Sequence, residues 1–140
     1  MVPTFRKVAS FGSIIGAFYL ISAPAFAASP CDVVDTHLTK QRRTDYAKLI
    51  AGNLNAKVRP SKVDVTKFMQ AASWTVVYAN VPVADPGYFF FETSSGAPKF
   101  KDVWGGVADK SEAPAIFAWA MKLGANRAIA SCFTDMVAGD

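Results

Sequence analysis

Residues that could perform acid–base or nucleophilic chemistry are few in this sequence and form no recognisable pattern. The one histidine, His37, follows Asp35 and Thr36 at the expected start of a helix. A histidine in such a place is more often a capping or surface residue than a general base. The serines at 94–95 and Ser111 lack the strand–turn–helix context of an activated nucleophile. We therefore expect no catalytic residue, and the sequence favours a protein that is not an enzyme.

Patterns for binding a metal or a cofactor are also missing. The acids Asp85, Glu92, Asp102 and Asp109 flank expected strands, where carboxylates usually serve solubility. The pair at 105–106 is a glycine bend without the rest of a phosphate-binding loop. No Cys-x-x-Cys spacing and no cluster of histidines is present to hold zinc. We expect no bound metal and no cofactor.

The two cysteines, Cys31 and Cys132, predict one disulfide. In an oxidising compartment a pair of cysteines such as this usually crosslinks. The bond would close a loop of about 100 residues and stabilise the fold by about 4 to 5 kcal/mol in the chain-entropy model. Lipidation of Cys31 is the alternative, but the preceding Ala28 and Pro30 fit a lipidation signal poorly.

Positive charge is concentrated in the segment 40–67, which contains eight Lys and Arg residues and two acids. It is either a solvated surface or an electropositive patch for an anionic partner, such as lipid headgroups, cell-wall polymer or an acidic protein. Arg42 falls near the middle of the apolar stripe of the expected first helix, which is unusual for a guanidinium. Such an arginine usually pairs with a carboxylate or extends to solvent, and less often marks a binding site. Arg42 and Arg43 are therefore candidate binding residues.

Four consecutive aromatic residues, 88–91, form the most distinctive run in the chain. Because successive side chains of a strand point to opposite faces, this run places large rings on both faces of a sheet. Either helices cover both faces, or one face is an exposed aromatic platform for a partner. Under the second interpretation, the candidate contacts are Tyr88, Phe89, Phe90 and Trp104.

Periodic apolar residues predict helices at both ends of the chain and strands between them. Pro82 with residues 85–87 predicts one connection and residues 93–98 another, and such short connections join antiparallel strands. The predicted elements are a helix capped by Asp35 or Thr36 and ending near Ala51, a short strand at 63–65, strands at 74–79, 88–91 and 100–107, a helix capped by Ser111 and ending at Gly124, and a last helix capped by Asn126.

These elements predict an α+β fold with an N-terminal helix, a three- to four-stranded antiparallel sheet and two C-terminal helices. Residues 28–140 contain no internal repeat or low-complexity linker, so we expect them to form a single small domain.

The first 27 residues predict a cleavable signal peptide. Arg6 and Lys7 precede an apolar stretch at 8–23, and Ala25-Phe26-Ala27 has the small-x-small pattern of a cleavage site after Ala27. A membrane anchor is the alternative, but an apolar stretch of about 16 residues is shorter than the roughly 20 that span a bilayer. We expect a periplasmic or secreted protein, with no transmembrane segment after cleavage and no nucleic-acid partner.

Small size, an expected disulfide and surplus aromatic surface together favour an exported binding module. Our first hypothesis is a module that engages a protein partner in the cell envelope, as inhibitor-like and immunity-like proteins do. An alternative is a binder of a small ligand or an anionic envelope polymer, with the basic segment recognising the anionic groups. A second alternative is an enzyme of unrecognised type.

Overall fold

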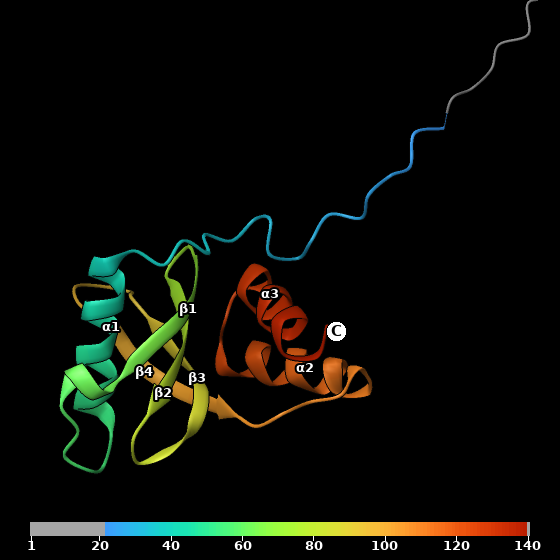
Figure 1. Cartoon of the computed structure of the whole chain (residues 1–140). Helices are drawn as coiled ribbons and strands as arrows, with labels where there is room; N and C mark the ends of the chain where they lie inside the picture. The colour runs from blue at the N-terminus through green and yellow to red at the C-terminus, as the bar shows by residue number, and fades with distance from the viewer. Residues whose placement is uncertain (1–21, 140) are drawn as a thin grey trace, which may run out of the picture.

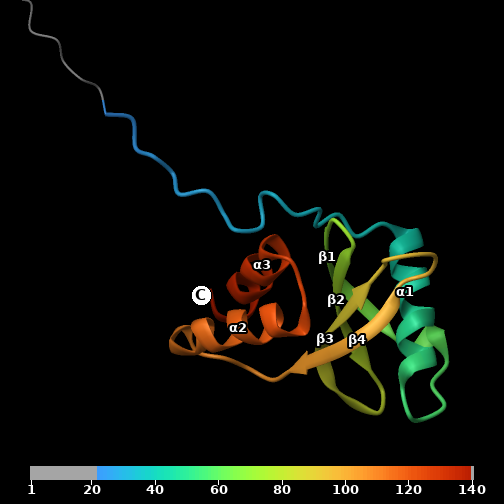
Figure 2. The ribbon, with the colours of Figure 1, turned by 180° about the vertical axis from the view of Figure 1, so that it is seen from behind.

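A computed structural model describes residues 22–139 and shows three layers: a helix, a four-stranded antiparallel sheet and a pair of helices (Figures 1 and 2). The strands follow one another in the order β1-β2-β3-β4, so every neighbour in the sheet is also a neighbour in sequence. This arrangement confirms the predicted α+β fold. The elements are α1 (Lys40–Asn53), β1 (Asp64–Ala71), β2 (Trp74–Val81), β3 (Ala84–Glu92), β4 (Lys99–Gly105), α2 (Ala113–Leu123) and α3 (Arg127–Ala138), with short 3-10 helices η1 (Pro60–Lys62) and η2 (Lys110–Glu112).

The signal peptide prediction falls mostly outside the described part of the chain. Residues 1–21 are not described, and residues 22–29 have no helix or strand. Among residues 22–139, no helix has both the length and the apolar character that crossing a membrane would require.

Helix α1 begins four residues later than a cap at Asp35 would place it, and three residues later than a cap at Thr36. The Thr39 side chain is the N-cap and accepts a hydrogen bond from the Arg42 N–H at 3.1 Å. Asp35 is instead in extended chain, where it exchanges two backbone hydrogen bonds of 2.9 Å with Gln70 of β1. Asp35 is therefore kept out of the helix by its pairing with β1. The helical periodicity of the sequence does not reveal this pairing.

The connection between β2 and β3 includes Pro82 as predicted but is shorter than the predicted one, which extended to residues 85–87. The turn is at residues 82–83, and residues 85–87 are already part of β3. Gly87 pairs with Ala79 on one side and Gly105 on the other. A Cβ at Gly87 would lie only 2.9 Å from the Val103 side chain, so glycine here permits close approach of two strands rather than a turn.

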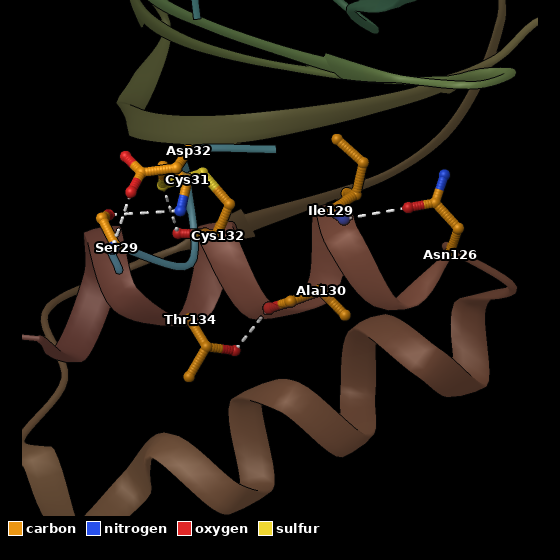
Figure 3. Close-up of a disulfide and its surroundings, with 8 residues drawn as sticks. All are labelled: Ser29, Cys31, Asp32, Asn126, Ile129, Ala130, Cys132 and Thr134. Atoms are coloured by element: carbon orange, nitrogen blue, oxygen red, sulfur yellow. Dashed lines mark hydrogen bonds between the residues drawn. A yellow bond between two sulfur atoms is a disulfide. The ribbon is translucent and has the colours of Figure 1, made fainter. Parts of the chain in front are cut away.

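The C-terminal helices follow the predicted order with one changed cap. Ser111 does not cap α2, because Asp109 and Glu112 form a capping box around η2, from which α2 continues. Gly124 ends α2 in the left-handed conformation with φ of 104°. The Asn126 side chain caps α3 as predicted, accepting from the Ile129 N–H at 2.9 Å (Figure 3).

The aromatic run on β3 belongs to the core, because helices cover both faces of the sheet. Phe90 packs edge-on against Phe133 of α3 with ring centroids 4.9 Å apart, and Tyr88 contacts the same ring at 5.2 Å. Phe89 points to the opposite face, into the cluster that α1 covers. The exposed aromatic platform is therefore wrong for Tyr88, Phe89 and Phe90, which are at most 6% exposed. Trp104 is partly buried and packs at 5.8 Å from Phe133.

The disulfide between Cys31 and Cys132 is present, as predicted (Figure 3). It joins the extended segment before α1 to the buried face of α3, with the two Cα atoms 4.6 Å apart. A turn at its start is closed by the Ser29 N–H, which donates to the Asp32 carboxylate at 2.9 Å. The N-terminal segment is thus fixed at Cys31 to α3 and at Asp35 to β1.

Reduction of this disulfide should lower the free energy of unfolding by about 2 to 5 kcal/mol, because the bond closes a long loop and Cys132 is fully buried. Urea denaturation of the exported protein, oxidised and reduced, measures the difference. The Cys31→Ala/Cys132→Ala double variant should match the reduced protein. Equal unfolding midpoints for the oxidised and reduced forms would contradict the stabilising role of the bond.

Candidate functional site

An open groove of about 560 Å³ lies on the α1 face of the molecule. We call it the α1 groove. Its walls come from three separate parts of the chain, namely α1, β1 and the loop that leads into β4. Its lining residues are Arg42, Asp45, Tyr46, Lys48, Leu49, Phe68, Gln70 and Pro98.

Helix periodicity places the α1 residues of the groove. Arg42, Tyr46 and Leu49 are spaced at i, i+4 and i+7, so they lie on one stripe of the helix facing the sheet. Asp45 and Lys48 flank this stripe and are exposed at its rim. One helix therefore supplies both the apolar wall and the charged rim of the groove.

Aromatic rings form the floor. Tyr46 is buried, and its ring meets Phe68 of β1 at 5.8 Å and Phe91 of β3 at 5.2 Å, both edge-on. Pro98 closes the groove from the loop between β3 and β4. That loop turns at Gly96, whose φ of 72° favours glycine.

Arg42 is held at one end of the groove by four contacts. One terminal nitrogen, Nη1, donates to the His37 carbonyl at 2.7 Å. The other, Nη2, contacts the Asp35 carboxylate at 2.7 Å and donates to the Gln70 side chain at 3.2 Å. The guanidinium also lies 4.3 Å above the centre of the Phe68 ring. These contacts explain how an arginine fits the apolar stripe of α1, and they fix its orientation.

The charge of Arg42 is balanced, but its hydrogen-bonding capacity is not exhausted. The Arg42 guanidinium holds the pKa of the Asp35 carboxyl below its ordinary value, helped by the backbone N–H of His37, so Asp35 is ionised at neutral pH. A guanidinium has five N–H donors, and three contacts to protein oxygens occupy about three of them. Within residues 22–139, the remaining N–H groups have no protein acceptor.

Tyr46 contributes an uncharged hydroxyl beneath the groove. Burial raises the pKa of the Tyr46 phenol, and a side-chain hydrogen bond with Thr75 acts in the opposite direction. The hydroxyl is therefore protonated at neutral pH, and the floor of the groove carries no negative charge of its own.

The other predicted site residues lie away from the α1 groove. Arg43 points to the other side of α1, where its guanidinium contacts the Asp64 carboxylate at 3.4 Å and remains exposed. Tyr88, Phe90 and Trp104 belong to the cluster on the opposite face of the sheet. Of the predicted residues, only Arg42 is therefore part of the groove.

The sequence did not indicate the residues that surround Arg42. In the sequence, Tyr46 and Leu49 belong to the apolar stripe of the expected first helix, and the segment with Phe68 and Gln70 has no clear periodicity. The available signal was the position of Arg42 itself, because a guanidinium among apolar residues needs partners from other elements. No group of three or more His, Cys, Asp or Glu residues placed to hold a metal ion occurs in the described part of the chain.

The pKa of Asp35 should rise towards its ordinary value of 3.8 when Arg42 is replaced by Gln, because the guanidinium is the main cause of its lowering. In the native protein the pKa lies below that value. The Asp35–Arg42 contact thus contributes its full stability above pH of about 3.8 and loses it as the pH falls through the lowered pKa. A carbon-13 NMR titration of the side-chain carboxyl measures both values.

Arg43→Gln is the matched control for this titration, because Arg43 is the next residue of the helix and contacts Asp64 instead. It should leave the pKa of Asp35 unchanged. An Asp35 pKa that is the same in the native protein and in Arg42→Gln would show that the two groups do not interact in solution.

Comparisons with protein-family models, with curated proteins and with solved structures found no match to this chain.

Proposed function

We propose that this chain is an exported binding module that holds a small monoanionic ligand with an apolar body in the α1 groove. The observation that carries the proposal is the groove itself, which combines an aromatic floor with a fixed guanidinium at one end. Its volume of about 560 Å³ is within the range of about 300 to 1,000 Å³ that is usual for small-molecule sites.

Each part of such a ligand has a counterpart in the groove. The apolar body would lie against Phe68, Leu49 and Pro98, where contact with water is already reduced. The acidic group would accept hydrogen bonds from the remaining Arg42 N–H groups and lie near the Lys48 ammonium at the rim. Because Arg42 is already oriented by its protein contacts, binding would cost little side-chain entropy.

Asp45 favours a ligand with one negative charge over a ligand with two. Its carboxylate is at the same rim and accepts a hydrogen bond from the Gln41 amide at 2.8 Å. A second negative charge on the ligand would be repelled by this carboxylate, while a hydroxyl or an amide could donate to it.

Export is the second part of the proposal and is supported by two observations. The sequence begins with a charged, then apolar, then small-residue pattern, as signal peptides do. The disulfide is compatible with an oxidising compartment. The hypothesis of a protein partner on the aromatic sheet is less well supported, since Tyr88, Phe89 and Phe90 are buried.

The fluorescent dye 1-anilinonaphthalene-8-sulfonate, a monoanion with an apolar body, is a suitable probe of the groove. We expect the folded, oxidised protein to bind one dye molecule with a rise in fluorescence. Leu49→Glu should weaken that affinity at least about tenfold, because it places a negatively charged side chain in the apolar wall, where it repels the sulfonate. Lys48→Glu, an exposed rim change, should weaken it by a few-fold through charge alone.

Met121→Glu is the matched control, because Met121 is exposed on α2, in the layer on the opposite side of the sheet. It should leave the affinity for the dye unchanged. Thermal unfolding of each variant shows that it is folded. Equal losses of affinity in Leu49→Glu and Met121→Glu, or no effect of either groove variant, would overturn the proposed site.

A further inference from the structure

A second surface, distinct from the floor of the α1 groove, is defined by exposed positive charge. We call it the basic surface: Lys40 and Lys48 on α1, Lys57 and Arg59 in the connection after α1, and Lys62 in η1. All five are exposed, and within residues 22–139 none of them forms an ion pair. The other arginines of this region, Arg42 and Arg43, are each paired with an aspartate.

The fold holds the basic side chains of the connection outward. Leu54 and Val58 pack against the cluster beneath α1, and Val63 is buried there. The residues between these anchors, including Lys57 and Arg59, are turned to solvent. The short helix η1 is closed by hydrogen bonds from its own backbone, with the Val63 N–H donating to the Pro60 carbonyl at 3.1 Å.

Charge is distributed unequally between the two sides of the sheet. The segment 40–67, which includes α1 and η1, has eight Lys and Arg residues against two acids. The segment 109–138, which includes α2 and α3, has three of each sign. Because α1 and the α2–α3 pair lie on opposite sides of the sheet (Figures 1 and 2), the positive potential is concentrated on one side of the molecule.

The composition of the basic surface does not match a protein–protein interface. Such interfaces have an apolar centre with aromatic residues and few lysines. The large hydrophobic side chains that are exposed in the described part of the chain all lie outside residues 40–67, and include Val83, Val107 and Met121. Apart from the α1 groove beside Lys48, the basic surface has no apolar centre, and its long, exposed, unpaired Lys and Arg side chains fit a surface of distributed negative charge.

We propose that the basic surface adsorbs this protein to an anionic phospholipid membrane, with the α1 side facing the lipid headgroups. The attraction is electrostatic and does not require insertion of a side chain into the bilayer, so it is reversible and weakens with salt. The inference goes beyond the proposed groove, because it concerns where the protein resides rather than what it holds.

Co-sedimentation of the exported, oxidised protein with vesicles tests this proposal. The vesicles contain phosphatidylcholine with about one third phosphatidylglycerol, and phosphatidylcholine vesicles are the uncharged reference. We expect binding to the anionic vesicles only, with loss of binding near 0.5 M salt, at about which ionic strength exposed charges are strongly screened. Lys57→Gln/Arg59→Gln/Lys62→Gln should lower the membrane partition coefficient at least about tenfold.

The matched control is Lys99→Gln/Lys110→Gln/Lys122→Gln, which removes the same number of charges from exposed residues of β4, η2 and α2. It should lower the partition coefficient much less than the first triple variant. Equal losses would show that net charge alone is responsible and would overturn the basic surface. Binding to soluble polyphosphate without binding to anionic vesicles would assign the surface to a polymer and would also overturn the proposal.

The dye titration separates this proposal from the groove. Lys57, Arg59 and Lys62 do not line the α1 groove, so their triple variant should bind the dye with native affinity. Loss of membrane binding with intact dye binding supports the membrane proposal. Loss of both membrane binding and dye binding would indicate that the triple variant has lost its fold, which thermal unfolding detects. In that case the Arg59→Lys variant, which keeps the positive charge, should still bind the membrane. Absence of membrane binding in that variant and in the native protein would contradict the proposal.

Discussion

The contact between Arg42 and Asp35 is the interaction on which the α1 groove depends. Asp35 comes from extended chain and Arg42 from the first turn of α1, while Gln70 and Phe68 of β1 complete the surroundings of the guanidinium. The contact therefore ties three segments together at one point. Its geometry requires Asp35 to be held in place, and the disulfide at Cys31 and the backbone pairing with Gln70 provide this. A crosslink to α3 thus supports a site on the other side of the sheet.

The same arrangement explains why the α1 groove opens between its helix and the sheet. On the α3 side, Phe133 contacts Tyr88, Phe90 and Trp104, so large rings fill the space between helices and sheet. On the α1 side a single helix covers the sheet, and its charged residues alternate with Tyr46 and Leu49. One helix cannot fill the width of four strands, and the loop with Pro98 closes only part of what is left. The groove is therefore a consequence of unequal coverage of the two faces.

Much of the fold could be predicted from the sequence, because its signals are local. The caps at Gly124 and Asn126, the aromatic strand and the order of the elements follow from backbone preferences and side-chain periodicity. Errors arose where a distant segment decides the outcome: Asp35 pairs with β1 instead of starting α1, and Gly87 allows β3 to approach β4 instead of turning the chain. The groove could not be predicted for the same reason, since Phe68 and Pro98 reach it only through tertiary packing. Arg42 is the one groove residue that could be predicted as a binding residue, because a guanidinium in the apolar stripe of a helix is unusual.

The central claim is that the α1 groove is a ligand site with Arg42 fixed at one end. It is tested most directly by mapping the bound dye on the folded protein with backbone amide NMR spectra. The account predicts that the amide signals that shift on titration belong to residues around the groove, such as Arg42, Leu49 and Gln70, and that they saturate together at one equivalent. Shifts that are centred on α2 and α3, or that are scattered over the molecule without saturation, would contradict it.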